Sequence, residues 1–120
     1  MSLRVNGGHS CGASILNSMW VITAAHCIRR TRKYSIQFDN TVISQNGTNV
    51  IEVEKVIPHP KYDSSNQSIN DIGLVKLIEP ISSKFSEFRV RLPVNGAYYP
   101  TGTPSVLAGW GLNEVYNQLS

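Results

Sequence analysis

The apolar residues of this 120-residue chain fall in short runs, each the length of a strand and none the length of a helix. The runs cover residues 13–16, 20–22, 34–38, 50–57, 72–78 and 106–110. Between them lie clusters of Asn, Gly and Pro, residues that favour turns. Several short strands joined by turns predict a small all-β barrel or sandwich.

Alternating polarity supports the strand prediction. Tyr34, Ile36 and Phe38 alternate with polar residues, and the run 50–57 interleaves Ile and Val with charged residues, as in strands with one buried face. Apolar residues nowhere repeat at helical spacing between two caps, so any helix is expected to be a single turn. The best candidate is residues 24–27, with Thr23 as its N-cap.

The length fits one compact domain, and 41% hydrophobic against 16% charged residues is typical of a folded chain, not a disordered one. The most connector-like stretch is 95–104, rich in Gly, Pro, Tyr and Thr. The residues after it are too few to fold as a second domain. We therefore expect one domain followed by a connector.

The net charge of +3 comes from one cluster, because four of the eleven basic residues are Arg29, Arg30, Arg32 and Lys33. A nucleic-acid-binding protein needs a broader basic face with aromatic residues or a recognition element, so no nucleic-acid partner is expected. No run approaches the roughly 18 apolar residues of a membrane span. Residues 1–15 also lack the pattern of a secretory signal.

Cys11 and Cys27 have no CxxC or paired histidine spacing beside them, so they do not predict a metal site. They are either a disulfide or two buried thiols. A bridge would close a loop of about 15 residues, worth roughly 3 kcal/mol. Sequons begin at Asn46 and Asn66 in polar stretches, and together with the cysteine pair they favour an extracellular, glycosylated protein.

Two strings carry the chemistry: Thr-Ala-Ala-His-Cys at 23–27 and Asn-Asp-Ile-Gly-Leu-Val-Lys-Leu at 70–77. A lone His or Asp at a turn is usually an ordinary polar residue. As complete strings in this order, however, they resemble the trypsin and chymotrypsin family of serine endopeptidases. Within that family the chain is similar to arthropod members. The likeness runs from residue 2 through 58–62 to the Gly-Trp-Gly at 109–111.

The resemblance implies the first six-stranded antiparallel Greek-key barrel of a two-barrel fold. Residues 1–104 would form this barrel, ending in the connector 95–104, and residues 105–120 would begin the second barrel. It also implies a secreted protease that uses no cofactor and acts on protein or peptide substrates, with protein protease inhibitors as further partners.

The resemblance assigns His26 as general base and Asp71 as the carboxylate that orients it, with a Cys11–Cys27 disulfide bracing the histidine loop. A serine hydroxyl is a weak nucleophile, so it needs a base such as imidazole, whose usual pKa is near 6.5. A carboxylate on the other ring nitrogen selects the tautomer and stabilises the imidazolium that forms. By the same comparison, His9 and His59 match no catalytic position and are predicted to be polar loop residues.

The nucleophile of this family lies in a Gly-Asp-Ser-Gly-Gly string, and no serine here stands between two glycines. The serine, the oxyanion hole and the pocket for the substrate's P1 side chain belong to the second barrel. The chain alone is therefore expected to be an inactive fragment, incomplete at its start as well. The alternative is a non-catalytic protease homologue with a binding or regulatory role, but the retention of both His26 and Asp71 favours the enzyme.

The chain differs from common family patterns at two places and carries a basic run after the histidine loop. Gly73 stands where the family commonly has Ala, and it is expected to loosen the backbone beside Asp71. The stretch 44–49, where some members bind calcium, has no carboxylate, which predicts no metal. The basic run 29–33 would border the leaving-group side of the substrate cleft and favour acidic residues there. The simpler interpretation of that run is a solvated loop.

Overall fold

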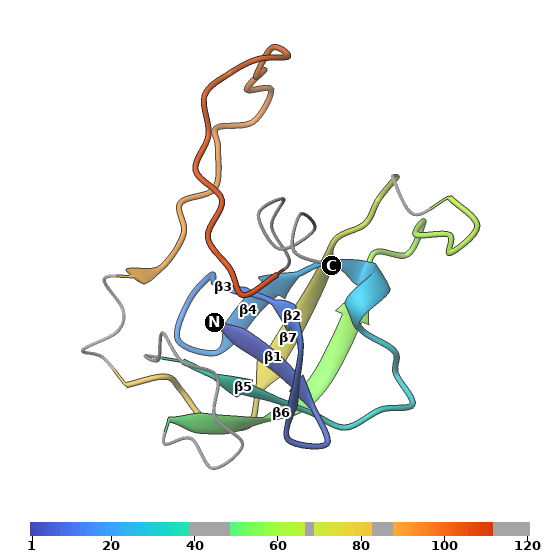
Figure 1. The fold of residues 1–120 in the computed structure, drawn as a ribbon, viewed down its shortest axis with the longest axis vertical. Coiled ribbons are helices and arrows are strands. Elements are labelled where there is room, and N and C mark those ends of the chain that lie inside the picture. Colours follow the sequence, from blue (N-terminus) through green and yellow to red (C-terminus); the bar gives the residue numbers. More distant parts are fainter. Residues whose placement is uncertain (39–48, 67–68, 83–87, 112–120) are drawn as a thin grey trace, which may run out of the picture.

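A computed structural model describes residues 1–38, 49–66, 69–82 and 88–111, and these form an antiparallel β-structure with one short 3₁₀ turn (Figure 1). The elements, in chain order, are β1 (Ser2–Val5), β2 (Gly8–Gly12), β3 (Ser14–Ile15), β4 (Trp20–Thr23), η1 (Ala25–Cys27), β5 (Tyr34–Gln37), β6 (Val50–Pro58) and β7 (Gly73–Leu77). Within these described ranges, no helix is long and apolar enough to cross a membrane.

The strands form one sheet in the order β2-β1-β5-β6-β7-β4-β3, and every pairing is antiparallel. The two edge strands, β2 and β3, are consecutive in the chain and are separated by Ala13 alone. Residues 8–15 therefore act as one bent strand that pairs with β1 at one end and β4 at the other. This bend nearly closes the sheet into the predicted six-stranded barrel.

The strand order is a Greek key. With β2 and β3 counted as one strand, β1, β2/β3 and β4 follow each other as neighbours, and β5 returns to pair with β1. This is the 4-1-2-3 order that defines the motif. Ala13 keeps the barrel joined at the bend, because its backbone exchanges hydrogen bonds of 3.0 and 2.9 Å with Met1.

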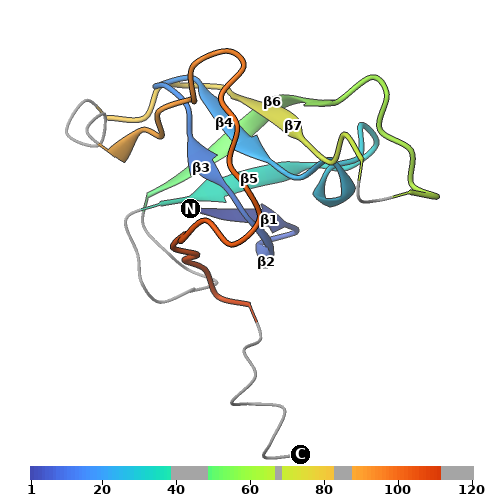
Figure 2. The same ribbon diagram turned by 90° about the horizontal axis from the view of Figure 1, so that it is seen from above.

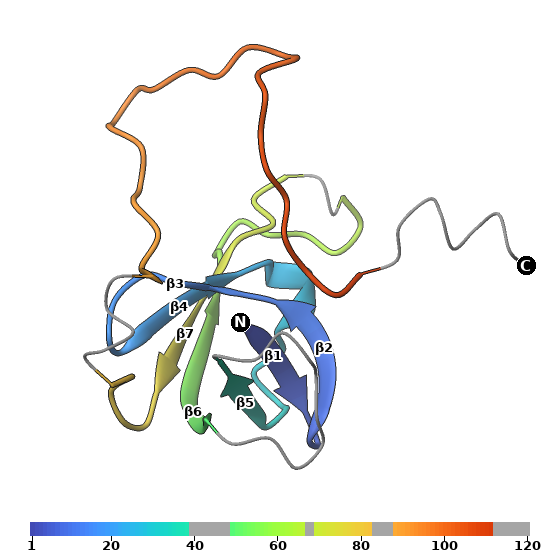
Figure 3. The ribbon, with the colours of Figure 1, turned by 60° about the vertical axis from the view of Figure 1, so that its left-hand side comes forward.

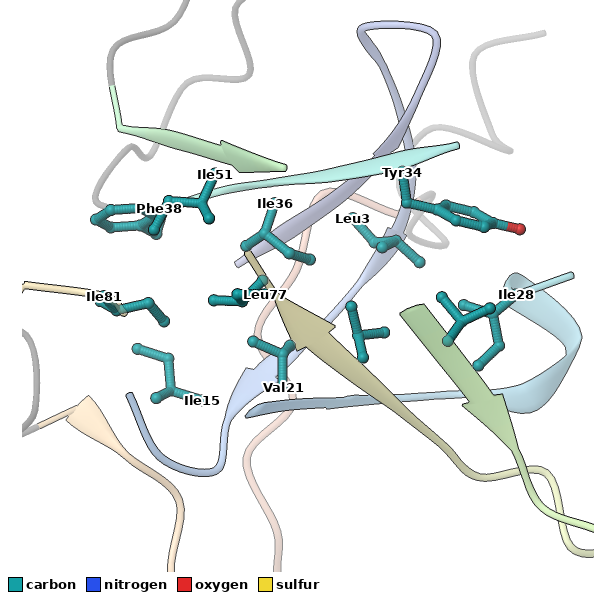
Figure 4. Packing of buried hydrophobic residues seen from close by; sticks show 12 residues of the cluster. Leu3, Ile15, Val21, Ile28, Tyr34, Ile36, Phe38, Ile51, Leu77 and Ile81 are labelled. Carbon is teal, nitrogen blue, oxygen red and sulfur yellow. The ribbon is translucent and has the colours of Figure 1, made fainter. Parts of the chain in front are cut away.

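The core lies inside the barrel and draws on β1 and on β3 to β7 (Figure 4). Leu3, Val21, Ile36, Val75 and Leu77 are fully buried. They come from β1, β4, β5 and β7. Burial alternates along β4 and β7, as expected for strands with one face toward the interior, whereas polar residues of β1 and β5 are buried as well. Burial of such side chains contributes roughly 1.5–3 kcal/mol each, before the cost of ordering the chain.

The sequence did not predict two of the strands, and one run that it predicted as a strand is not a strand. Both β1 and β2 carry too few apolar residues for a recognisable run, and Ser2 and Arg4 are buried in β1 despite being polar. The run 106–110 is not a strand: it pairs with no described strand, and Val106 and Leu107 are 97% and 99% exposed.

Residues 88–111 leave the barrel as an extended arm (orange to red in Figures 1 and 3). Exposed apolar side chains line it, among them Leu92, Val94 and Tyr98. Its last residues return to the side of the barrel where β1 and β2 lie (Figure 2). There the Trp110 ring meets the ring of His9 edge-on, with the ring centroids 5.6 Å apart. The arm therefore touches the barrel at its two ends and is open to solvent between them.

Candidate active site

His26 is presented by η1, the single turn that follows β4. The predicted helix start is wrong in detail: the residue at the N-cap position is Ala24, and no side chain caps the turn. Thr23 instead ends β4, and its hydroxyl donates to the Gly12 carbonyl at 2.8 Å. Within η1, Ala25 is buried and His26 is exposed, so the turn is anchored by one side chain while it displays the next.

Asp71 reaches the same place from the neighbouring strand, because it lies two residues before β7 begins. The β4–β7 register pairs Thr23 with Gly73, so the chain leaves β4 where it enters β7. Just before Asp71, Asn70 has a left-handed backbone (φ 56°), a conformation that Asn tolerates better than most residues. Its side-chain amide donates to the Lys61 carbonyl at 3.1 Å, which fixes this turn against the preceding loop.

The two side chains form a closely bonded pair. His26 Nδ1 lies 2.6 Å from Asp71 Oδ2, and the His26 backbone N–H donates to Asp71 Oδ1 at 2.8 Å. An ionised carboxylate can only accept, so Nδ1 carries a proton, and in the neutral ring Nε2 is then the nitrogen with the lone pair. These hydrogen bonds from the His26 side chain and backbone lower the pKa of Asp71, so it is ionised at neutral pH.

The predicted disulfide between Cys11 and Cys27 is present and ties β2 to η1. Cys27 Sγ lies 3.3 Å from His26 Nε2, so the bridge sits directly against the imidazole. The His26 side chain is nevertheless 48% exposed, against 21% for Asp71. The arrangement holds one ring nitrogen on the carboxylate and leaves the ring accessible from solvent.

Gly73 has a packing role that the sequence comparison did not predict. It is buried, and a Cβ at this position would overlap the terminal methyl of Ile28, a core residue just after η1. The missing methyl thus lets β7 approach the segment that carries His26. Gly73 therefore makes room for Ile28.

Tyr62 and Arg29 extend the electrostatic surroundings of Asp71. Partial desolvation is the main cause of the raised pKa of Tyr62, followed by the negative charges of Asp71 and Asp63, whereas Arg29 opposes the rise. Arg29 and the two carboxylates of Asp71 and Asp63 therefore shift the pKa of Tyr62 in opposite directions. No pattern of spacing could have found Tyr62, although it stands in the 58–62 segment that carries the family likeness.

The four basic residues of the predicted substrate loop have different surroundings. All four are exposed. Arg30 and Arg32 line a pocket of about 250 Å³ together with β6 residues, and neither His26 nor Asp71 borders it. Arg29 instead acts on Tyr62, near Asp71.

The other predicted residues take no part in the His26–Asp71 pair. Asn66 is exposed in a turn closed by its N–H bond to the Asp63 carbonyl (3.1 Å), whereas Asn46 is outside the described residues. His59 is in a loop, as predicted. His9 is not a loop residue: it belongs to β2, and its Nδ1 is 2.8 Å from the Ser2 hydroxyl oxygen.

Among the described residues, the Cys11, His26 and Cys27 side chains form a cluster of metal-ligating types, with ligand atoms within 4.8 Å of one another. Both sulfurs are consumed by the disulfide, so no thiolate is available to a metal. The stretch considered for calcium, 44–49, lies outside the described residues except for Asn49. The chemistry available at this site is therefore that of the His–Asp pair.

An open pocket of about 780 Å³ lies beside the pair on the face of the barrel. Asp71 borders it together with residues 12–14 and 22–24, and residues 107–110 of the returning arm form its other wall. The ionised carboxylate is thus reachable from one side, while its two oxygens are held by His26. Such a pair can accept a proton at the free imidazole nitrogen from a group brought to it.

Comparison with known proteins agrees with this chemistry. A family model described as Trypsin matches residues 1–119. "Serine protease 1" of the dog is 34% identical over 113 residues, 94% of this chain and 45% of its own length. "Chymotrypsin-like elastase family member 1" of the dog is 34% identical over 116 residues, 93% of this chain and 45% of its own. "Trypsin-3" of Salmo salar is 37% identical over 106 residues, 88% of this chain and 43% of its own.

The chain thus spans less than half the length of these curated relatives. The relatives are vertebrate proteins, so the likeness to arthropod members stays a prediction. The matches agree with the nearly closed antiparallel barrel described above.

Proposed function

Because the chain belongs to the trypsin family of serine proteases, we propose that the complete protein is a secreted serine endopeptidase in which this stretch supplies the catalytic base and the carboxylate that orients it. The observation that carries the proposal is the His26–Asp71 pair, with Nδ1 on one carboxylate oxygen and Nε2 free to accept a proton. Its substrates are proteins or peptides.

In this mechanism His26 Nε2 removes the proton from a serine hydroxyl as it attacks the scissile carbonyl, and then returns that proton to the leaving amine. Asp71 stabilises the imidazolium between these two steps and keeps the ring in the correct tautomer. No serine of the chain lies in a Gly-Asp-Ser-Gly-Gly string, so the nucleophile would come from further residues of the protein. We therefore expect the 120 residues to be inactive alone.

The domain division belongs to the same proposal. Residues 1–104 would form the first barrel with its connector, and 105–120 would begin the second. The exposed apolar side chains of the arm support this division, because Val94, Tyr98 and Leu107 have nothing to pack on within the described barrel. A second barrel would bury them.

The decisive test measures cleavage of fluorogenic peptides with basic, aromatic and small P1 residues by the complete protein. The wild type should cleave at least one, and His26→Ala should lower kcat about 10⁴-fold or more. His59→Ala is the matched control, the same change at a loop histidine whose side chain accepts a hydrogen bond from the Lys61 backbone and takes no part in the pair, and it should keep full activity. A wild type without turnover would favour a non-catalytic homologue. Turnover by the 120 residues alone, lost in His26→Ala, would contradict their expected inactivity.

We also propose that Arg29 favours acidic residues on the leaving-group side of the substrate. Its support is the charge effect that Arg29 shares with Asp71 at Tyr62. Complementary charge at a cleft rim alters selectivity more than overall affinity. In the complete enzyme, Arg29→Glu should reduce the preference for Asp over Lys at those positions, while Arg89→Glu, the same charge change on the arm, should not. An unchanged preference in Arg29→Glu would exclude this role.

Extracellular localisation with glycosylation at Asn66 is part of the proposal. The Cys11–Cys27 disulfide supports an oxidising compartment, and the exposure of Asn66 leaves room for a glycan. Expression in a secreting eukaryotic cell should yield protein in the medium whose mass falls on glycosidase treatment. Asn66→Gln should remove part of that difference, and Asn46→Gln tests the other sequon.

A further inference from the structure

A second pocket lies on the barrel wall between the loop that follows η1 and β6, where the 28–34 connection passes beside the strand (cyan and green in Figure 1). It has a volume of about 250 Å³. Its lining contains three cations and one carboxylate, with apolar side chains between them; the residues are Arg30, Arg32, Tyr34, Val53, Glu54, Lys55 and Val56.

The cationic side of this pocket is not neutralised within the described structure. Among the described residues, the ion pairs are His26–Asp71 and Lys76–Glu54, the latter at 2.8 Å. Glu54 therefore already shares its charge with Lys76, which lies outside the pocket lining. This leaves Arg30, Arg32 and Lys55 with an excess of positive charge over one small concave surface.

The loop that carries the arginines is formed before any ligand arrives. The Arg32 N–H donates to the Arg29 carbonyl at 3.1 Å, closing a turn, and the Arg29 N–H is bonded to the Tyr34 hydroxyl at 2.7 Å. Tyr34 itself is only 3% exposed and packs in the core. The turn is thus fixed to the barrel, so a ligand need order only the side-chain ends.

From this combination we infer that the pocket of Arg30, Arg32 and Lys55 binds an acidic peptide segment, separately from the His26–Asp71 pair. A Glu or Asp carboxylate would accept charge-assisted hydrogen bonds from the guanidinium groups, which suit bidentate binding. A neighbouring apolar side chain would lie on the partly apolar wall that Val53 and Val56 supply. The pocket volume suits one or two side chains.

The composition of the wall favours a peptide over a sulfated polysaccharide. A polysaccharide with a sulfate on most sugars would bring several negative charges against Glu54 and leave the apolar part of the wall uncovered. A peptide can place one carboxylate on the arginines and an apolar side chain beside it. The two ligand types are therefore separable by experiment.

The test measures fluorescence anisotropy of a fluorescein-labelled Gly-Glu-Leu-Glu-Gly peptide with the complete protein carrying His26→Ala, so that the probe cannot be cleaved by the proposed chemistry. Arg30→Ser/Arg32→Ser should weaken binding about tenfold or more, because two charged contacts are lost. Arg89→Ser/Arg91→Ser removes the same charge from the exposed arm and should change the Kd less than about twofold. Thermal unfolding of each variant checks that it is folded.

Two further experiments test the site without altering the arginines. Glu54→Gln should tighten peptide binding, because it removes the one negative charge of the wall, and a Gly-Gln-Leu-Gln-Gly probe should not bind measurably. Equal loss of binding in the two double variants would overturn the inference, since it would then reflect net charge alone. Binding of labelled heparin without binding of the peptide would also overturn it. Neither result depends on protease activity.

Discussion

The Asp71 carboxylate holds His26 by two bonds at once: Oδ2 lies 2.6 Å from Nδ1 of the ring, and Oδ1 accepts the backbone N–H of the same residue at 2.8 Å. The second bond matters because it fixes the carboxylate to the η1 backbone as well as to the movable ring. Ring orientation and tautomer are thereby set by one residue that is 45 positions away in the chain.

Asp71→Asn should abolish most of the activity of the complete protein while leaving the fold intact. Asn can keep a hydrogen bond to the backbone, but its side chain favours the wrong imidazole tautomer. We expect kcat to fall about 10⁴-fold, the loss known for the equivalent change in trypsin. Steady-state kinetics with far-UV circular dichroism would check it. A loss below about tenfold would show that Asp71 does not orient the base.

Stability should also depend on Asp71 in acid. Because the His26 hydrogen bonds lower its pKa from 3.8, the folded state binds this proton less readily than the unfolded state. The contribution of Asp71 is therefore complete above the unfolded value and is lost as the pH falls through the lowered one. The difference in thermal midpoint between wild type and Asp71→Asn should shrink as the pH falls below about 4.

Asp63 offers an internal control for that measurement. Its pKa is also lowered, chiefly by the Ser65 backbone N–H bond of 2.8 Å, but it is the same in both proteins and cancels in the difference. A difference between wild type and Asp71→Asn that stays constant from neutral to strongly acidic pH would contradict the assignment.

Loss of the Cys11–Cys27 bridge should destabilise the barrel and disturb the site together. The bridge joins β2 to η1 and touches the His26 ring, so Cys11→Ala/Cys27→Ala should lower the free energy of unfolding by roughly 3 kcal/mol. Urea unfolding of the complete protein, with the reduced wild type as the matched reference, measures this. A double variant as stable as the oxidised wild type would show that the bridge does not constrain the chain.

Gly73→Ala should be destabilising in the wild type and tolerated once Ile28 is shortened. The added methyl would overlap the end of Ile28, and overpacking of this kind costs about 1–3 kcal/mol. Ile28→Val removes the overlapping methyl at a cost of about 1 kcal/mol. The double variant should therefore be more stable than the sum of the single changes, by about 1 kcal/mol or more in unfolding experiments. Strict additivity would contradict the contact.

Much of the barrel could be predicted because most of its strands carry short apolar or alternating runs bounded by turn residues. Tyr34 and Ile36 alternate with Ser35 and Gln37, and the structure confirms a strand there, although all four residues are buried, so the expectation of one exposed face was wrong. The prediction failed where the burial of a residue does not match its polarity. In β1, Ser2 and Arg4 are buried although they are polar, and Leu107 is apolar yet exposed. Each of these depends on which segment lies alongside, and a local pattern cannot contain that information.

The sequence by itself determined which residue types are available for the site and in which order they occur: a histidine beside a cysteine, and an aspartate before an apolar strand. Only the tertiary structure decided that they meet, because the register of β4 on β7 sets Thr23 opposite Gly73 and so joins two distant segments. It also divided the basic loop, with Arg30 and Arg32 facing β6 and Arg29 acting near Asp71. Chain spacing encodes local conformation, whereas distances between remote side chains arise only from strand pairing and packing.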